Sequence, residues 1–464
     1  MKKRERLIWI GIVVFILIVT TASGLHHWIF AGDTDKTYEQ LRLFNEVFNL
    51  IRTEYYDPKK ASTENLINGA IEGMIKALDD PHTSFLNKEL FKELQTDTSA
   101  EFGGLGIVIG IRDGWITVIA PIDDTPASKA GIRAGDKIIE IEGKSTEGYT
   151  TMDAVRLLRG KVGTKVTITI RRESVKEPIH FTITRGLIKI ETVKSQLINN
   201  HIGYIRISQF SEPTPEAFMS HVLKLKEQGA DSFIIDLRNN PGGLLSSVIQ
   251  IADMILDEGV IVSTKGRDPK DYREYKARKG SLTDDMPLIV MINDGSASAS
   301  EILAGAIKDN HRGILVGTKS YGKGSVQTVR RLPGDVGIRI TTALYYTPSG
   351  KSIDKIGIEP DEVVEPVEIT EEDMSKIKKI DEKKIIKEFV EKHPVPTDRD
   401  YAELYKLLDE ENLSLKSIIV RRLVKNELER NKVPSLIDLD YDVQLRHAVN
   451  MLKVMDLYLK KKAS

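Results

Sequence analysis

The sequence predicts a multidomain α/β protein that follows one membrane-spanning helix. Patterns typical of strands and of helices alternate through the middle of the chain, which favours an α/β core. The 464 residues exceed the size of one ordinary domain, so about three domains are expected. An uncharged apolar stretch near the N-terminus is long enough to span a bilayer.

The N-terminus combines a basic cluster with this apolar stretch. Residues 1–6 read MKKRER, and residues 7–30 contain no Asp, Glu, Lys or Arg. A basic flank stays in the cytoplasm, so we expect residues 1–31 to form an uncleaved signal anchor and the rest of the chain to be exported. A cleaved signal peptide is the alternative, because the small residues 21–24 follow the apolar core, and it would give a secreted protein.

The composition excludes several classes of function. Lys and Arg number 67 and Asp and Glu number 68, so no basic character indicates a nucleic-acid partner. The chain has no cysteine, which rules out disulfides, thiolate metal sites and a cysteine nucleophile. The histidines are not clustered, apart from the pair at 26–27. We therefore expect neither a metal nor another cofactor.

The chain is organised around residues 293–327. The apolar run 288–292 predicts a buried strand, and a helical pattern with Ser298 at its beginning follows the turn at 293–295. A second apolar run, 314–316, leads into a loop in which Lys323 lies between two glycines. The order predicts a serine at a helix mouth and a lysine loop that folds back on it.

A serine and a lysine in this order can act together. An uncharged lysine amine can serve as the base for a serine hydroxyl if burial lowers its pKa. Glycines on both sides of Lys323 would allow a close approach of the backbone. Gln327, four residues further, could orient the amine by hydrogen bonding. Activity should then rise with pH as the amine loses its proton.

The same residues have a purely structural interpretation. Ser298 and Glu301 form an S-x-x-E pattern, which is a capping box at many helix N-termini. Lys323 taken alone would be a solvated loop lysine. Spacing in one sequence does not decide between these interpretations.

Two segments show a family resemblance. N-D-G-S-A-S-A-S-E-I (293–302) and Y-G-K-G-S-V-Q (321–327) resemble the signature of the C-terminal processing peptidases, or tail-specific proteases, which are Ser/Lys-dyad serine peptidases with an inserted PDZ domain. The resemblance implies that Ser298 is the nucleophile, Lys323 the general base and Gln327 the residue that orients the lysine. Ser296 and Ser300 are the competing serines in the same segment. The resemblance also implies a crotonase/ClpP-like catalytic core.

Residues 100–186 resemble a PDZ domain over their whole length. Asp113-Gly114 is a hairpin signal between alternating runs, and residues 165–170 alternate as a strand. PDZ domains add a peptide as a strand and hold its terminal carboxylate with backbone N–H groups of one loop. By resemblance, that loop consists of Gly104, Leu105, Gly106 and Ile107.

A glycine pair follows another predicted strand, 233–237. Gly242 and Gly243 precede an apolar helix, and exposed N–H groups at such a turn can hold a developing oxyanion. The structural alternative is a plain strand-to-helix turn. In the family this loop supplies the oxyanion hole, which implies Gly242 or Gly243 as one donor and Ala299, next to the nucleophile, as the second.

One arginine is a candidate for regulation. In related peptidases a PDZ arginine contacts the catalytic glutamine and reports bound substrate. Arg159, just past the predicted PDZ helix, is the candidate here, and Arg156 competes with it. The default interpretation of either residue is a solvated charge.

We expect five regions: the anchor (1–31), a helical region (36–98), the PDZ domain (100–186), the Ser/Lys protease core (190–365) and a C-terminal helical region (366–464).

The resemblance implies an endopeptidase on the periplasmic side of a bacterial cell membrane that binds unfolded C-termini of exported or membrane proteins. A homo-oligomer, dimer or higher, and a possible adaptor protein are further implied partners. The alternative is a non-catalytic, PDZ-based scaffold that binds protein tails on the same fold.

Overall fold

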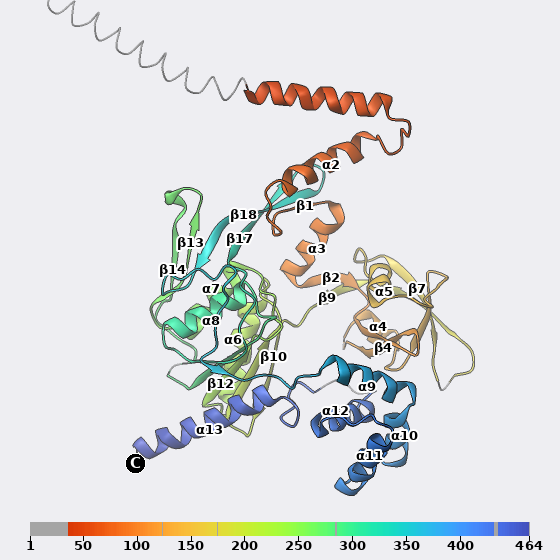
Figure 1. Cartoon of the computed structure of the whole chain (residues 1–464), viewed down its shortest axis with the longest axis vertical. Helices are drawn as coiled ribbons and strands as arrows, with labels where there is room; N and C mark the ends of the chain where they lie inside the picture. The colour runs from red at the N-terminus through yellow and green to blue at the C-terminus, as the bar shows by residue number, and fades with distance from the viewer. Residues whose placement is uncertain (1–35, 123, 174, 284, 431–434, 464) are drawn as a thin grey trace, which may run out of the picture. The chain divides into compact units, whose positions relative to one another are not determined.

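The computed structural model describes residues 36–463, except for residues 123, 174, 284 and 431–434 (Figure 1). The predicted anchor at 1–31 lies outside the described residues. Within them, no helix has both the length and the apolar character needed to cross a membrane. The chain divides into two compact units between Phe85 and Leu86.

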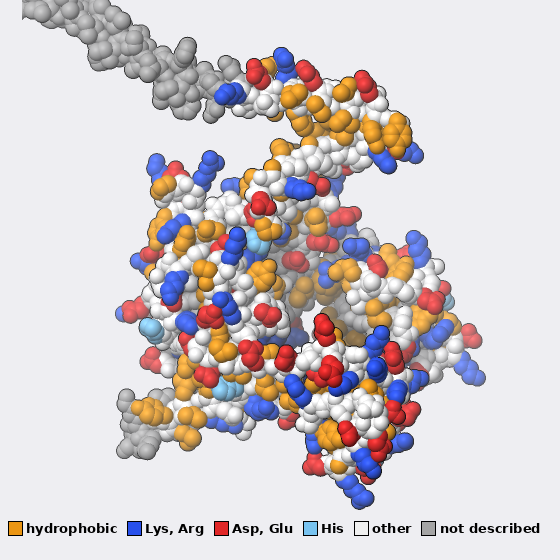
Figure 2. Space-filling model, viewed as in Figure 1, with side chains coloured by type: hydrophobic (Ala, Val, Ile, Leu, Met, Phe, Trp, Pro, Cys, Tyr) orange, Lys and Arg blue, Asp and Glu red, His pale blue; other side chains and the backbone are white. Residues whose placement is uncertain are grey.

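The first unit is helical where it is described. Residues 36–54 form one helix and α2 (Thr63–Lys76) a second, which Ser62 caps by accepting from the Asn65 N–H at 3.3 Å. The apolar residues at helical spacing in the first helix are exposed, and Figure 2 shows them as a hydrophobic strip along it. The helical prediction is confirmed, but these side chains do not enter a core of the described chain. The strand β1 (Ser84–Leu86) spans the division.

The second unit begins with α3 (Lys88–Ser99) and continues into an antiparallel sheet at the predicted PDZ position. The strands run in the order β3-β4-β5-β7-β8, with β6 paired to β5 and β2 paired to β9. Asp113 and Gly114 have φ values of 49° and 78°, so the predicted hairpin turn is confirmed. The elements are β2 (Glu101–Gly104), β3 (Ile107–Arg112), β4 (Trp115–Pro121), α4 (Pro126–Lys129), β5 (Lys137–Ile141), β6 (Lys144–Ser145), α5 (Thr151–Leu158), β7 (Lys165–Arg171), β8 (Ile179–Thr184) and β9 (Gly186–Lys189).

The core of the second unit is a six-stranded sheet in the order β10-β11-β12-β15-β16-β19. All neighbouring strands are parallel except β10 and β11. Helices follow β11, β12 and β15 before the next strand of this sheet, as expected for an α/β core, whereas β17 and β18 lie between β16 and β19 in the chain. The elements are β10 (Val193–Ile198), β11 (Ile202–Ile207), α6 (Thr214–Glu227), β12 (Ser232–Asp236), α7 (Leu245–Ile255), β15 (Leu288–Ile292), α8 (Ala299–Asp309), β16 (Ile314–Gly317) and β19 (Glu362–Val363).

Both faces of this sheet are covered. Alternate residues of β12, such as Phe233 and Ile235, pack with α6, α7 and α8 in one cluster of fully buried side chains. The intervening Ile234 packs on the other face with Leu445 and Val449 of α13 (Val443–Ala463). Strands buried on both sides are continuous hydrophobic runs, which is why β12 and β15 were recognisable in the sequence.

A second sheet and a helical region complete the unit. β17, β18, β13 and β14 pair in that order, all antiparallel. Helices α9 to α12 enclose a separate apolar cluster around Leu404, Leu408 and Val420. The elements are β13 (Val260–Gly266), η1 (Pro269–Asp271), β14 (Arg273–Lys276), β17 (Ser325–Leu332), β18 (Val336–Tyr346), α9 (Glu371–Glu382), α10 (Ile385–Lys392), α11 (Asp398–Glu410) and α12 (Ser417–Leu428).

Candidate active site

Three loops meet at one edge of the six-stranded sheet. β12, β15 and β16 are parallel neighbours, so the loops that follow them leave the sheet at the same edge. These loops are 237–244, 293–298 and 318–324, and they carry the predicted glycine pair, Ser298 and Lys323. The carboxyl edge of parallel strands is the usual ligand site of open α/β sheets.

Ser298 lies at the mouth of α8 in a backbone conformation that serine rarely adopts. Its φ is 54° and its ψ is −112°. Such strain costs ~1–3 kcal/mol and persists mainly at functional sites. The residue is 7 % exposed, lines a cavity, and interacts through its hydroxyl with the phenol of Tyr345.

The two competing serines are fully buried and hold the loops together. The hydroxyl of Ser296 donates to the carbonyl oxygen of Leu237 at 2.8 Å. The hydroxyl of Ser300 donates to the carbonyl oxygen of Asn240 at 2.9 Å. Neither serine is among the residues that line the cavity, so the geometry favours Ser298 over both.

Glu301 is fully buried, and its carboxylate joins the helix mouth to the lysine loop. Oε2 accepts from the backbone N–H groups of Ser298 and Lys323, both at 2.8 Å. Oε1 accepts from the Ser320 hydroxyl at 2.6 Å and from the Gly322 N–H at 2.7 Å. The two interpretations are therefore compatible. The carboxylate of Glu301 binds the backbone N–H of Ser298, while the hydroxyl of Ser298 contacts Tyr345.

The lysine loop is held closely on both sides of Lys323. A Cβ on Gly324 would lie 2.2 Å from the backbone nitrogen of Asp354, so the predicted close approach at these glycines is confirmed. The Gly322 carbonyl accepts from Lys355 N–H and the Gly324 carbonyl from Tyr345 N–H, each at 2.7 Å. Lys323 lines the same cavity as Ser298.

Gln327 reaches that cavity because of a β-bulge. The pairing of β17 with β18 shifts register between Val326 and Gln327. Successive residues of a regular strand point to opposite faces, whereas the two consecutive residues at this bulge both line the cavity. The Gln327 amide donates to the hydroxyl of Ser325 at 2.8 Å and of Thr341 at 3.4 Å.

The two glycines after β12 differ in what their N–H groups do. The N–H of Gly242 donates to the side-chain oxygen of Asn240 at 2.9 Å. For the N–H groups of Gly243 and Ala299, no hydrogen bond is found among the described residues. A Cβ on Gly242 would lie 2.9 Å from the nitrogen of Ala299, so this turn lies directly against the start of α8. Gly243 and Ala299 are thus the better pair of free donors.

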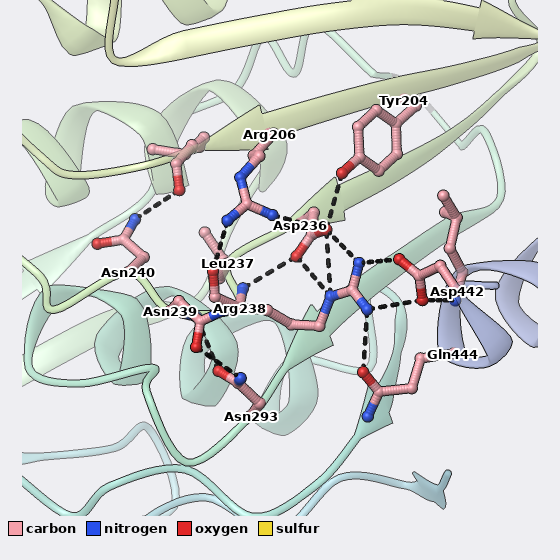
Figure 3. A network of polar contacts seen from close by, with 12 residues as sticks. Tyr204, Arg206, Asp236, Leu237, Arg238, Asn239, Asn240, Asn293, Asp442 and Gln444 are labelled. Atoms are coloured by element: carbon pink, nitrogen blue, oxygen red, sulfur yellow. Dashed lines mark hydrogen bonds and ion pairs between the residues drawn. The ribbon is translucent and has the colours of Figure 1, made fainter. Parts of the chain in front are cut away.

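A buried polar network anchors the loop that carries these glycines (Figure 3). Arg238 binds the fully buried Asp236 with contacts down to 2.7 Å and binds Asp442 through two bonds of 2.8 and 2.6 Å. It also donates to Gln444 at 2.9 Å. Since Asp442 directly precedes α13, the network ties the C-terminal helix to the glycine loop.

One cavity of about 1110 Å³ collects the predicted site residues. Its remaining wall includes apolar side chains of α3, α7 and β17. The residues of the site that line it are Gly242, Gly243, Ser298, Lys323, Gln327 and Tyr345. The cavity is therefore large enough for an extended peptide segment and is bordered by apolar surface.

The predicted carboxylate loop lies between β2 and β3. The carbonyl of Leu105 accepts from the Ala127 N–H at 2.8 Å, and the carbonyl of Gly106 accepts from the Ile122 N–H at 2.9 Å. Their own N–H groups have no partner in the described part of the chain. β3 is the edge strand of its sheet, so one of its two edges is available for a peptide strand. α5 contacts β3.

Among the described residues, no contact between Arg159 and Gln327 is found. Arg159 ends α5, and its guanidinium stacks on the ring of Phe102 at 4.0 Å. Asp97 lines the cavity, and burial raises its pKa above the ordinary value. The charge of Arg159 offsets part of this rise. The charge of Arg159 therefore acts on one residue of the cavity wall.

Three residues of the site were not predicted as functional. Tyr345 contacts the nucleophile candidate, Asn240 occupies the N–H of Gly242, and Glu301 was considered only as a cap. Tyr345 and Asn240 lie in segments where the sequence shows only a strand and a turn. The S-x-x-E spacing marked Glu301 as a capping residue, but no pattern in the sequence indicated its bonds to the loop 318–324. In the described part of the chain, no group of three or more His, Asp or Glu side chains could hold a metal ion.

Comparisons with known proteins identify the class. Residues 201–364 match the model of peptidase family S41, residues 117–172 match a PDZ domain, and residues 28–90 match the activating protease CtpB N-terminal domain. The class is therefore a serine peptidase that carries a PDZ domain.

Curated relatives narrow the class to a family. A carboxy-terminal-processing protease of Bartonella bacilliformis is 45 % identical over 341 residues, covering 73 % of this chain and 78 % of the relative. The carboxy-terminal processing protease CtpA of Bacillus subtilis is 35 % identical, with 78 % and 77 % covered. A carboxyl-terminal-processing protease of Synechocystis is 38 % identical, with 79 % and 89 % covered. The chain belongs to the C-terminal processing peptidases of family S41, and it is a serine endopeptidase that processes protein C-termini.

Proposed function

We propose that Ser298 is the nucleophile of this peptidase and Lys323 its general base. The observation that carries the proposal is the strained serine at the mouth of α8, which lines one cavity together with Lys323. Both residues also bind one carboxylate oxygen through their backbone N–H groups. Gln327, at the bulge of β17, is the residue that orients the amine.

The reaction follows from these positions. The neutral amine of Lys323 takes the proton of the Ser298 hydroxyl as the oxygen attacks the scissile carbonyl. The N–H groups of Gly243 and Ala299 bind the oxyanion, since the N–H of Gly242 is occupied by Asn240. The protonated amine then gives its proton to the leaving nitrogen as the peptide C–N bond breaks. Water, losing a proton to the neutral amine, hydrolyses the Ser298 ester, which releases the new carboxyl terminus and restores the hydroxyl. One oxyanion donor typically contributes about 3–4 kcal/mol of barrier lowering.

The PDZ domain is proposed to capture the substrate by its C-terminus. The free N–H groups of Leu105 and Gly106 and the edge strand β3 support carboxylate binding with strand addition. The substrates in this proposal are unfolded C-termini of exported or membrane proteins. Arg159, near Asp97 at the cavity wall, is the candidate for sensing a bound substrate.

The location and assembly are proposals from the sequence. A basic cluster before the apolar segment 7–30 supports a single-pass anchor in a bacterial cell membrane with the peptidase on the periplasmic side, and secretion after signal cleavage is the alternative.

The exposed apolar strip on the helix of residues 36–54 supports a homo-oligomer or an adaptor. The alternation of parallel strands and helices supports a crotonase/ClpP-like core.

Substitution of the two residues tests the dyad. Ser298→Ala and Lys323→Arg are expected to fold and to lose peptide cleavage by at least a thousandfold, whereas Lys319→Arg, an exposed neighbour, keeps the parent rate. The measurement is cleavage of a peptide with an apolar C-terminus across a pH series. The parent rate should rise with pH as the amine becomes neutral. Full activity of Lys323→Arg would contradict the dyad.

A further inference from the structure

Glu301 presents an arrangement that neither a cap nor a surface charge explains. The side chain is completely buried, and four donors converge on its two oxygens at 2.6–2.8 Å. Only one donor belongs to its own helix mouth. The other three come from the loop 318–324, which follows β16.

One atom connects the two halves of the dyad. Oε2 of Glu301 accepts from the backbone N–H of Ser298 and from the backbone N–H of Lys323, each at 2.8 Å. The two nitrogens therefore lie no farther apart than two such bonds placed end to end. A single oxygen thus limits the separation of two loops that follow different strands of the sheet.

The charge of Glu301 is balanced by dipoles instead of by a counterion. Among the described residues no ion pair of Glu301 is found, and the carboxylate lies in the first turn of α8, where the helix dipole favours a negative charge. Hydrogen bonds to a charged acceptor are shorter and stronger than neutral ones. If the lysine loop moved away, this buried carboxylate would keep only the donor from Ser298. The loop position that places Lys323 beside Ser298 is therefore the one that satisfies Glu301.

We propose that Glu301 is a positioning residue of the peptidase: it fixes the lysine loop against the nucleophile and thereby holds the base within reach of the hydroxyl. This role rests on the proposed Ser298–Lys323 dyad. Glu301 touches neither substrate nor reacting atoms, so its removal should lower turnover while leaving substrate capture by the PDZ domain intact.

A graded set of variants tests the role in the full chain. Glu301→Gln keeps the shape and one acceptor, so its amide oxygen can still serve Ser298 and Lys323 while its NH₂ group faces the Gly322 N–H. We expect kcat to fall about tenfold. Glu301→Ala removes all four bonds, and kcat should fall at least a hundredfold. KM should stay within about threefold in both.

Two further variants separate positioning from stability. Ser320→Ala removes one donor that belongs to neither dyad residue and should lower kcat less than Glu301→Gln does. Ile307→Val, a buried position on α8 itself, should lower the melting temperature and leave kcat of the folded protein unchanged. The rate at which a fluorophosphonate labels Ser298 should fall in parallel with kcat for the Glu301 variants.

The outcomes distinguish this role from the dyad itself. Glu301→Gln and Glu301→Ala that are folded and turn over within threefold of the parent would overturn the positioning role. Losses that follow only the unfolded fraction, as measured by circular dichroism, would overturn it too. If instead Ser298→Ala cleaved like the parent, the dyad would be wrong whatever the Glu301 variants do.

Discussion

At the scale of single residues, Tyr345 is the side chain whose role is visible only in the folded protein. It is almost completely buried beside Ser298, and its backbone N–H donates to the carbonyl of Gly324 in the lysine loop. Burial and the neighbouring Tyr275 raise the pKa of Tyr345 to about 12, although its contact with Ser298 lowers it. The phenol is therefore neutral throughout the working range of a peptidase.

This raised pKa gives a prediction for the pH profile. Because the pKa of the phenol is about 12, the phenol keeps its proton near neutral pH and does not produce the rise of activity with pH. Tyr345→Phe should leave the pH of half-maximal activity unchanged, while kcat falls about twofold to tenfold from the loss of one hydrogen bond worth ~1 kcal/mol. A rate–pH curve of this variant checks both values. A shift of the midpoint by a full pH unit would assign the titration to Tyr345.

At the scale of elements, the PDZ domain combines a free edge strand with a loop of unpartnered N–H groups. β3 pairs with β4 on one side only, and α5 lies against it. Gly106 has a φ of 77°, and a Cβ there would lie 2.3 Å from Cβ of Thr125. Glycine at this position therefore lets the loop close against α4 while its N–H groups stay available.

A peptide with an apolar C-terminus should bind this loop by its carboxylate. In the full chain with Ser298→Ala, amidation of the peptide C-terminus is expected to weaken binding at least tenfold, because the N–H groups of Leu105 and Gly106 then lose a charged acceptor. Fluorescence anisotropy measures the two affinities. Gly106→Ala should weaken binding, and Gly114→Ala is the matched control, since it has a similar φ of 78° but no atom near the added Cβ. Equal affinities for acid and amide would rule out carboxylate capture.

At the scale of the whole molecule, the C-terminal region is joined to the catalytic loops through charge. Arg238 connects the loop of the glycine pair to Asp442, just before α13 (Figure 3). Burial alone would raise the pKa of Asp236, but the bonds from Arg238 and the charge of Arg206 outweigh it and hold the pKa below its ordinary value. A carboxylate with a lowered pKa stabilises the fold above its unfolded pKa, and this contribution is lost as the pH falls through the folded pKa.

Removal of the arginine should therefore have a pH-dependent cost. Arg238→Met leaves the buried Asp236 with a weaker set of partners and is expected to lower the free energy of unfolding by about 3–5 kcal/mol at pH 7. The difference from the parent should be smaller at pH 3.5 than at pH 7, because without Arg238 burial raises the pKa of Asp236 and the carboxyl of the variant becomes neutral as the pH falls. Urea unfolding at pH 7 and pH 3.5 measures both.

An exposed ion pair provides the control for this experiment. Arg331 pairs with Asp335, and both side chains are about two-thirds exposed. Arg331→Met should change the free energy of unfolding by less than about 1 kcal/mol at either pH. A cost of Arg238→Met that does not depend on pH would show that Arg238 acts through packing and not through the charge of Asp236.

Local patterns in the sequence were sufficient for much of the fold. The runs at 233–237 and 288–292 predicted strands, since a strand buried on both faces is apolar at every position, and Asp113-Gly114 predicted its hairpin. Ser298 at a helix mouth and Lys323 between close-packed glycines were also predicted from neighbouring residues. Each of these signals depends on side chains that lie within a few residues of each other.

The sequence by itself determined the family, the serine and lysine that we propose as the dyad, and the order of strands and helices around them. Only the tertiary structure decided that Gly243, and not Gly242, has a free N–H, that Glu301 binds both dyad residues, and that Asp442 holds the glycine loop through Arg238. Periodicity and turn chemistry act between near neighbours in the chain. A hydrogen bond between loops of different strands depends on how those strands lie in the sheet, and no local pattern contains that information.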